Sequence, residues 1–204
     1  MLAGKMERKY LAHYIDASFG SGVYVKTTDT AIQSGKTYYT LTGTAYTAVA
    51  SPVLASIEDY YEKVPNYVIL GHDLEEYSEE LNPNVEVTTN ILGEQSVTHS
   101  GYEVSSDVDP FYAYEGDPLF EHLSEIANER LTGTACITTK VDVLVDAQGT
   151  VVWAYREDVY VVPNSLGGDT SGVQIPFAIN NAGNRVRGTW NTTTKTFTPE
   201  TVSG

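Results

Sequence analysis

The carboxy-terminal third of the chain constrains the fold most, because runs of β-branched and aromatic residues alternate there with turn sequences. The turns read DAQG, PNSLGGDTSG, NNAGN and NTTT. Short strands at this spacing, separated by Asn and Gly turns, are typical of an antiparallel sandwich or barrel. The pattern predicts five strands, at 135–145, 150–162, 173–179, 185–190 and 195–198.

One helix is expected upstream of these strands, over 117–131. Asp117 is suited to the N-cap, Pro118 to the first turn, and Gly133 to the end of the helix. Its packing face is predicted from apolar residues at helical spacing, namely Leu119, Phe120, Leu123, Ile126 and Ala127. We therefore predict a mainly β fold: an antiparallel β-sandwich or flattened barrel with one flanking α-helix.

Residues 28–65 are interpreted as a small inserted subdomain, and 1–27 with 66–204 as the parent domain. The insertion contains two Thr/Tyr-rich strands, KTYYTL and TAYTAV, predicted to be joined by a Thr42-Gly43 hairpin turn. A short helical stretch, LASIEDYYEK, follows Pro52. Because a lone hairpin is marginally stable, this one must pack on its helix or on a neighbour.

Between the insertion and the helix lies an acidic strand or turn, DLEEYSEELNPN, followed by EVTTNILGEQSVTHSGYEV. In the second segment, polar and apolar residues alternate around Gly93. This pattern predicts a long hairpin with one face in water.

Charge and cysteine content exclude several classes of protein. The net charge is −15, with 12 Lys+Arg against 27 Asp+Glu, which argues against a protein that grips nucleic acid through its phosphates. The lone Cys136 has no disulfide partner and is expected to be a buried structural thiol. The first twenty residues lack the apolar core of a signal peptide, and no run has the length of a membrane span, so we expect a soluble chain folded in a reducing cytoplasm.

No catalytic, metal or cofactor residues are predicted. The string SGKT at 34–37 lacks the glycine of a phosphate loop, since Thr30 stands six residues before the lysine. No pair among His13, His72, His99 and His122 has zinc-ligand spacing, and no nucleophile elbow occurs. The acidic residues of 73–80 lack the pattern of a Ca²⁺ loop, which favours a solvated or pore-facing edge. An enzyme is not expected.

Several ordered segments resemble the major tail tube protein of long-tailed, siphovirus-like bacteriophages. They are HYIDASFG, DLEEYSEELNPNVEVTTNILGEQSV, DPFYAYEGDPLFEHLSEIANERLTG and the stretch from VVWAYRED to RVRGTWN. The resemblance covers roughly residues 7–19 and 67–198. It begins at MERKYLAHYID, which makes Met6 a candidate start.

The resemblance implies a virion structural protein, located in the tail and in the host cytoplasm during assembly. Six copies would close a ring, and rings would stack into a tube through which DNA passes without specific binding. Tape measure, tail terminator and distal tail proteins would be further partners, with no cofactor and no membrane. The insertion would lie on the outer surface of the tube.

The resemblance implies roles for two sets of residues, one facing the lumen of the tube and one contacting the adjacent ring. The candidate lumen-facing acids are Asp73, Glu75, Glu76, Glu79, Glu80, Glu86 and Glu94. The loop 163–172 is either an anion nest or a flexible link that orders on a subunit of the adjacent ring. The resemblance favours the link. Segment 78–95 is the other candidate for this contact between rings. The residues expected to make the inter-ring contact are Asn164, Ser165, Leu166, Gly167, Gly168 and Asp169.

A second interpretation is a capsid decoration protein or an adhesin-like carbohydrate-binding module. Fifteen of the 204 residues are tyrosine, and the insertion holds many of them. Aromatic rings on a hairpin can stack on sugars, so the insertion would then be the binding surface. Electron microscopy of the purified protein separates the two, since only the first predicts tubes or stacked rings.

Overall fold

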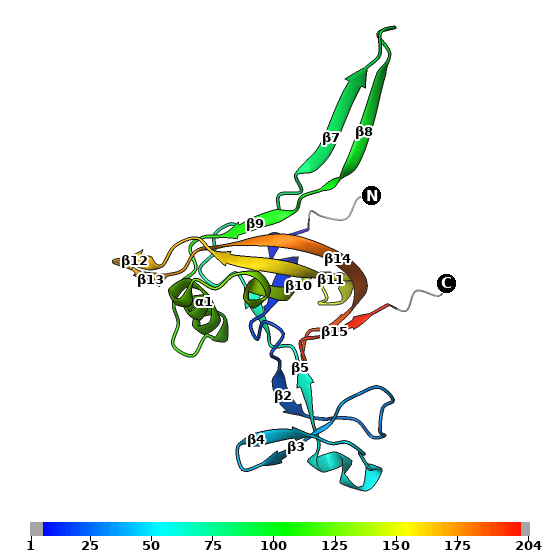
Figure 1. The fold of residues 1–204 in the computed structure, drawn as a ribbon, viewed down its shortest axis with the longest axis vertical. Coiled ribbons are helices and arrows are strands. Elements are labelled where there is room, and N and C mark those ends of the chain that lie inside the picture. The colour runs from blue at the N-terminus through cyan, green and yellow to red at the C-terminus, as the bar shows by residue number, and fades with distance from the viewer. Residues whose placement is uncertain (1–5, 201–204) are drawn as a thin grey trace.

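The main sheet of the protein is antiparallel and curls into a half barrel (Figure 1). The structure is a computed structural model that describes residues 6–200, so the outermost ends of the predicted parent domain, 1–5 and 201–204, lie outside the described residues. The sheet has the order β15-β14-β11-β10-β1-β6, and β9 also pairs with β14. Its strands are β1 (Leu11–Asp16), β6 (Tyr67–Leu70), β9 (Ser105–Val108), β10 (Ile137–Val145), β11 (Val151–Pro163), β14 (Phe177–Asn191) and β15 (Thr196–Pro199). The predicted mainly β class with a single α-helix is confirmed.

Strand β14 corrects one detail of the prediction. The sequence NNAGN was expected to be a turn between strands 173–179 and 185–190, but it lies inside this single long strand. The β11–β14 register shifts on both sides of Asp158, and Gly183 and Asn184 have positive φ of 93° and 58°. Residues of this kind can form a bulge as well as a turn, and here they bend the strand without reversing it.

The other strands predicted in the carboxy-terminal third occur close to their expected places, and two short 3-10 helices precede strands of the main sheet. A 3-10 helix, η3 (Gly133–Cys136), precedes β10, and another, η1 (Arg8–Tyr10), precedes β1. The expected long loop at 163–172 contains a small ribbon of β12 (Gly167–Asp169) and β13 (Gly172–Gln174).

Helix α1 (Pro118–Glu129) packs against the sheet. The Asp117 carboxylate accepts a hydrogen bond from the Leu119 amide at 2.9 Å, which caps the first turn as predicted. The helix ends earlier than the expected residue 131, because Arg130 takes the left-handed conformation and the Leu131 amide bonds the Ile126 carbonyl. No helix within residues 6–200 is long and apolar enough to cross a membrane.

The core is divided between the two faces of the curled sheet. The larger cluster joins Leu119 and Leu123 of α1 to strand residues that include Ile15, Val159 and Phe177. A second cluster gathers around Trp190 on strands β1, β6, β10, β11 and β14. Cys136 is buried, and burial raises the pKa of its thiol.

The inserted subdomain has its own sheet and its own small core. The sheet has the order β2-β5-β3-β4, from β2 (Val23–Lys26), β5 (Tyr61–Val64), β3 (Tyr39–Thr42) and β4 (Ala45–Ala48). A 3-10 helix, η2 (Leu54–Asp59), completes it. The buried side chains are Tyr38, Ile57 and Tyr60. In Figure 1 this unit lies at the opposite end of the molecule from the β7–β8 hairpin described below.

Three details of the insertion differ from the prediction. Strand β2 was assigned to the parent domain, but it pairs with β5, so the inserted unit spans about 23–64. Only 54–59 of the expected helical stretch is helical, because the residues that follow join the sheet. Thr42 pairs with Ala45, so the hairpin turn is Gly43-Thr44, with Gly43 at a φ of 63°.

Candidate functional site

A long hairpin projects from the body of the protein and is exposed along its length (Figure 1). It consists of β7 (Pro83–Thr89) and β8 (Gln95–Tyr102). Val87 pairs with Val97, and Val85 pairs with His99, so the three valines share one face. We call Val85, Val87 and Val97 the valine face. The sequence predicted an alternating hairpin with one wet face, but both faces are exposed.

The tip of the hairpin is ordered by one asparagine. The Asn90 side-chain oxygen accepts hydrogen bonds from the Leu92 and Glu94 amides at 2.9 and 3.0 Å, and its amide group donates to the Glu94 carboxylate at 2.6 Å. Ile91 is fully exposed and Leu92 is 78% exposed. A turn held this firmly presents two large apolar side chains to the surroundings.

The base of the hairpin is clamped to β9. Glu80 and Ser105 exchange backbone hydrogen bonds of 2.8 and 3.0 Å, and the Asn82 amide donates to the Glu103 carbonyl at 3.0 Å. The Tyr77 hydroxyl lies 2.8 Å from the Ser106 hydroxyl, and burial raises the pKa of Tyr77 to about 12. The hairpin therefore leaves the body from a fixed point.

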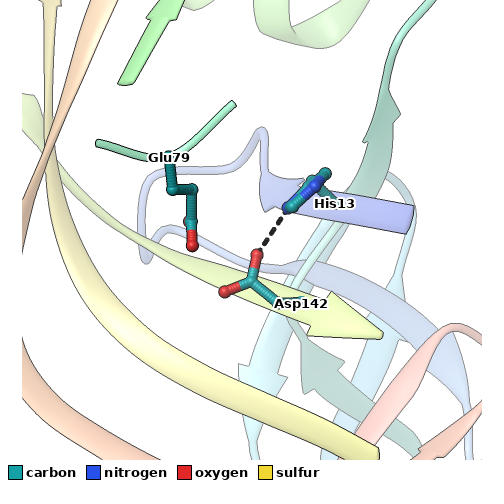
Figure 2. Close-up of side chains that lie close together, drawn as sticks. All are labelled: His13, Glu79 and Asp142. Carbon is teal, nitrogen blue, oxygen red and sulfur yellow. Dashed lines mark hydrogen bonds and ion pairs between the residues drawn. The ribbon is translucent and has the colours of Figure 1, made fainter. Parts of the chain in front are cut away.

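A buried ion network lies beneath this base. Figure 2 shows His13 of β1, Glu79 of the segment before β7 and Asp142 of β10 pointing toward one another. His13 Nδ1 lies 2.8 Å from Asp142 Oδ1. The fully buried Lys140 forms an ion pair with Glu79, and its Nζ lies 3.6 Å from Asp142 Oδ1.

Arg185 extends the network toward the surface. Its guanidinium lies 2.9 Å from Glu157 and 3.4 Å from Asp142, and Asn181 donates to Glu157 at 3.0 Å. A hollow of about 420 Å³ opens beside it, lined by Glu79, Leu81, Tyr102, Val104, Glu157 and Arg185. The network therefore reaches solvent at Arg185, beside the foot of the hairpin.

Burial and the neighbouring charges shift the pKa values of Lys140 and Asp142 in opposite directions. Burial is the largest influence on Lys140 and lowers its pKa, although Asp142 and Glu157 act in the other direction. For Asp142 burial is again the largest single influence and would raise the pKa, but the His13 hydrogen bond and the charge of Lys140 hold it below its ordinary value. The buried carboxylate is therefore kept ionised by its partners.

The same residues raise the question of a metal ion, since donor atoms of His13, Glu79 and Asp142 lie within 4.8 Å of one another. The Lys140 ammonium already contacts both carboxylates. A cation bound here would have to displace that buried ammonium. The chemistry of the set is that of an ion network that ties β1, β10 and the base of the hairpin together.

The candidate lumen-facing acids lie on three parts of the chain. Asp73, Glu75 and Glu76 lie on an exposed loop, where Asp73 hydrogen-bonds Tyr114 and His72. Glu80 pairs with β9, Glu79 enters the ion network, and Glu86 and Glu94 lie on the hairpin.

The remaining predicted residues lie on two other parts of the molecule. Residues 164–169 are exposed and lead into β12. On α1, Leu119, Leu123 and Ile126 are buried, and Phe120 and Ala127 are partly buried.

Sequence reasoning missed the buried network. Its signal is the run TTKVDVLV in β10, where Lys140 and Asp142 alternate with valines. Charged residues at alternate positions normally mark a wet face, but here they lie within a strand buried on both sides.

Fold and site together define a mainly antiparallel β protein whose half-barrel body carries a projecting amphipathic hairpin and an inserted Tyr-rich unit. A scan against protein-family models and a search of curated proteins found no match for this chain.

Proposed function

We propose that the protein is a structural subunit that assembles with copies of itself into stacked rings, forming the tail tube of a long-tailed bacteriophage. The valine face of the hairpin carries this proposal. Val87 and Val97 are 57% and 66% exposed although they lie side by side in a regular ladder. Apolar surface of this kind gains free energy when a partner covers it, at about 25 cal/mol per Å².

A second copy of the chain is the partner that the architecture favours. Within residues 6–200 the main sheet is open at both ends, with β6 and β15 as its outer strands. Open strand edges invite pairing, and head-to-tail contacts between identical subunits close into rings. A ring would cover the sheet edges, and the hairpin would be free to reach the next ring.

The hairpin is a better arm for that contact than the loop 163–172. Strands β12 and β13 have three residues each, whereas β7 and β8 have seven and eight. The apolar tip at Ile91 and Leu92 would reach furthest from the body (Figure 1).

The charge of the chain and its segment resemblance point to the kind of tube. With a net charge of −15, a tube of these subunits would repel DNA phosphates at close range, and salt would screen the repulsion within about 8 Å. DNA could then pass without sticking. The tape measure, terminator and distal tail proteins are the further partners that such a tube requires.

The proposal is tested with the full chain by sedimentation and negative-stain microscopy. Wild type should form rings or tubes, and Val87→Thr with Val97→Thr should weaken self-association about tenfold or more, because threonine keeps the shape and strand preference of valine without its apolar character. Thr88→Ser with Ser96→Thr, a directly paired couple on the opposite face, is the matched control. A wild type that stays monomeric at high concentration, or a valine variant that assembles normally, would overturn the proposal.

A further inference from the structure

The sheet of the inserted unit has two aromatic faces, and only one of them is covered. Tyr38 and Tyr60 are buried with Ile57 and the partly buried Val49. Side chains alternate along a strand, so the next residue in each strand points to the opposite side. These residues are Tyr39 after Tyr38, Tyr61 after Tyr60 and Ala48 before Val49. The small core thus accounts for one face of the sheet.

The second face carries four further tyrosines that this core does not use. Tyr39 pairs with Tyr61, Leu41 with Tyr46, and Tyr24 with Lys63, which places all of them on the same side of the sheet. We call this surface the tyrosine face, defined by Tyr24, Tyr39, Tyr46 and Tyr61 with Lys26 and Lys63.

The four rings contact one another in an unbroken row. Tyr24 stacks on Tyr46 with centroids 4.0 Å apart and planes 5° from parallel. Tyr39 meets Tyr24 edge-on at 4.9 Å, and Tyr61 meets Tyr46 at 5.1 Å. Such contacts hold the rings in place before any ligand arrives.

The charged residues of the strands are divided between the two faces. Lys26 and Lys63 lie over the rings of Tyr61 and Tyr24, 6.0 and 5.9 Å from their centroids. Glu62 points to the core side, where it pairs with Lys36 at 2.6 Å. The strands therefore present lysines and no carboxylate on the tyrosine face, in a chain of net charge −15.

The tyrosine face is open within residues 6–200. Lys26, Leu41, Ala48 and Lys63 are all exposed on it, and the four rings are partly exposed. Leu41 is its one large aliphatic side chain. Tyrosine is enriched at the core of protein–protein interfaces but lysine is depleted there, so the two lysines of this face favour an anionic ligand over a protein partner. Flat aromatic rings beside ammonium groups suit sugar rings, whose C–H faces stack on tyrosine and whose acidic groups pair with lysine.

We propose that the tyrosine face binds an acidic polysaccharide, through ring stacking and charge pairing with the two lysines. The anionic group is a uronic-acid carboxylate, which has the charge that the lysines require and is carried on a sugar ring that can stack on tyrosine. The site is separate from the hairpin and does not depend on assembly into a tube.

The test measures binding of three probes to the full chain by calorimetry: oligogalacturonate, the ring-free polyanion poly(glycerol phosphate) and neutral maltohexaose. Oligogalacturonate should bind saturably, about tenfold or more tighter than either of the other two, and added salt should weaken it. Binding of poly(glycerol phosphate) as tight as that of oligogalacturonate would show that charge alone is recognised and would contradict the proposal. Equal binding of all three, or of none, would overturn the proposal.

Two variants locate the site. Tyr46→Thr, which keeps strand preference, and Lys63→Gln should each weaken oligogalacturonate binding about threefold to tenfold, while Lys195→Gln, in a turn of the main sheet, should not. Unchanged thermal unfolding shows that each variant is folded; if Tyr46→Thr unfolds, Lys63→Gln alone decides. Three outcomes would contradict the proposed glycan site. They are normal binding by the folded variants, tighter binding of single-stranded DNA than of either glycan, and variants that change self-association and not glycan binding.

Discussion

Lys140 lies directly opposite Glu157 across the β10–β11 ladder, and both side chains are buried. The Lys140 ammonium contacts Glu79 and Asp142, while Glu157 pairs with Arg185. A buried charge destabilises the folded state unless it is paired, so removal of one partner leaves an unpaired charge in the interior. The network therefore makes the hairpin base sensitive to single substitutions.

Glu79 should differ in its effect on stability from the acids beside it in sequence. Glu79→Gln removes the charge that pairs with Lys140 and should lower the free energy of unfolding by about 1–3 kcal/mol. Glu76→Gln changes an exposed side chain and should alter it by less than about 0.5 kcal/mol. Chemical denaturation measures both, and equal effects would show that the Glu79 ion pair is not formed.

The contribution of Asp142 should depend on pH in a defined direction. Its pKa is held below the ordinary value of 3.8, so its ionised form stabilises the folded state. That contribution is complete above the ordinary value and is lost as the pH falls through the lowered pKa. At pH 7 Asp142→Asn should cost about 3–5 kcal/mol. The difference from wild type should shrink below about pH 4.

Denaturation at several pH values checks this prediction, with Asp107→Asn on an exposed position of β9 as the control. A difference that stays constant down to pH 2 would contradict it.

The helix makes the most direct test of core packing. Leu123 is fully buried between α1 and the sheet, and Leu123→Ala should cost about 2–5 kcal/mol because it leaves a cavity. Glu125→Ala on the exposed side of the same helix should cost little. A loss under about half a kcal/mol at Leu123 would mean that the helix does not pack as described.

The inserted unit should be removable. Asp16 pairs with Tyr67 and the Ala17 amide bonds the Asn66 carbonyl, so the chain leaves and re-enters the main sheet at adjacent points. Replacing 22–65 with a short Gly/Ser linker should leave the body folded and its self-assembly unchanged. Circular dichroism and microscopy check both properties. A folded deletion protein that no longer assembles would identify the insertion as an assembly element.

The strands and helix were predictable because their signals are local. Asp117, Pro118 and the apolar spacing of α1 lie within one short segment, and so do the β-rich runs around β10, β11 and β15. The sequence NNAGN was misread because a bulge and a turn use the same residues. The boundary at residue 28 was misplaced because the pairing of β2 with β5 spans almost forty residues.

The buried network could not be predicted from local patterns. His13 and Asp142 are 129 residues apart in sequence and meet only because β1 and β10 pair. Glu79 was grouped with its acidic neighbours, although its side chain alone turns inward to Lys140. The valine face, in contrast, follows from alternation, but only the structure shows that nothing in residues 6–200 covers it.

The continuity of β8 with β9 has a mechanical consequence. Strand β9 follows the hairpin after two residues and is bonded to β14, which in turn pairs with β11 along most of its length. A pulling force on the hairpin tip would therefore act first on the four register pairs that join β9 to β14. The short β9–β14 ladder would bear that tension before the longer β11–β14 ladder of the half barrel did.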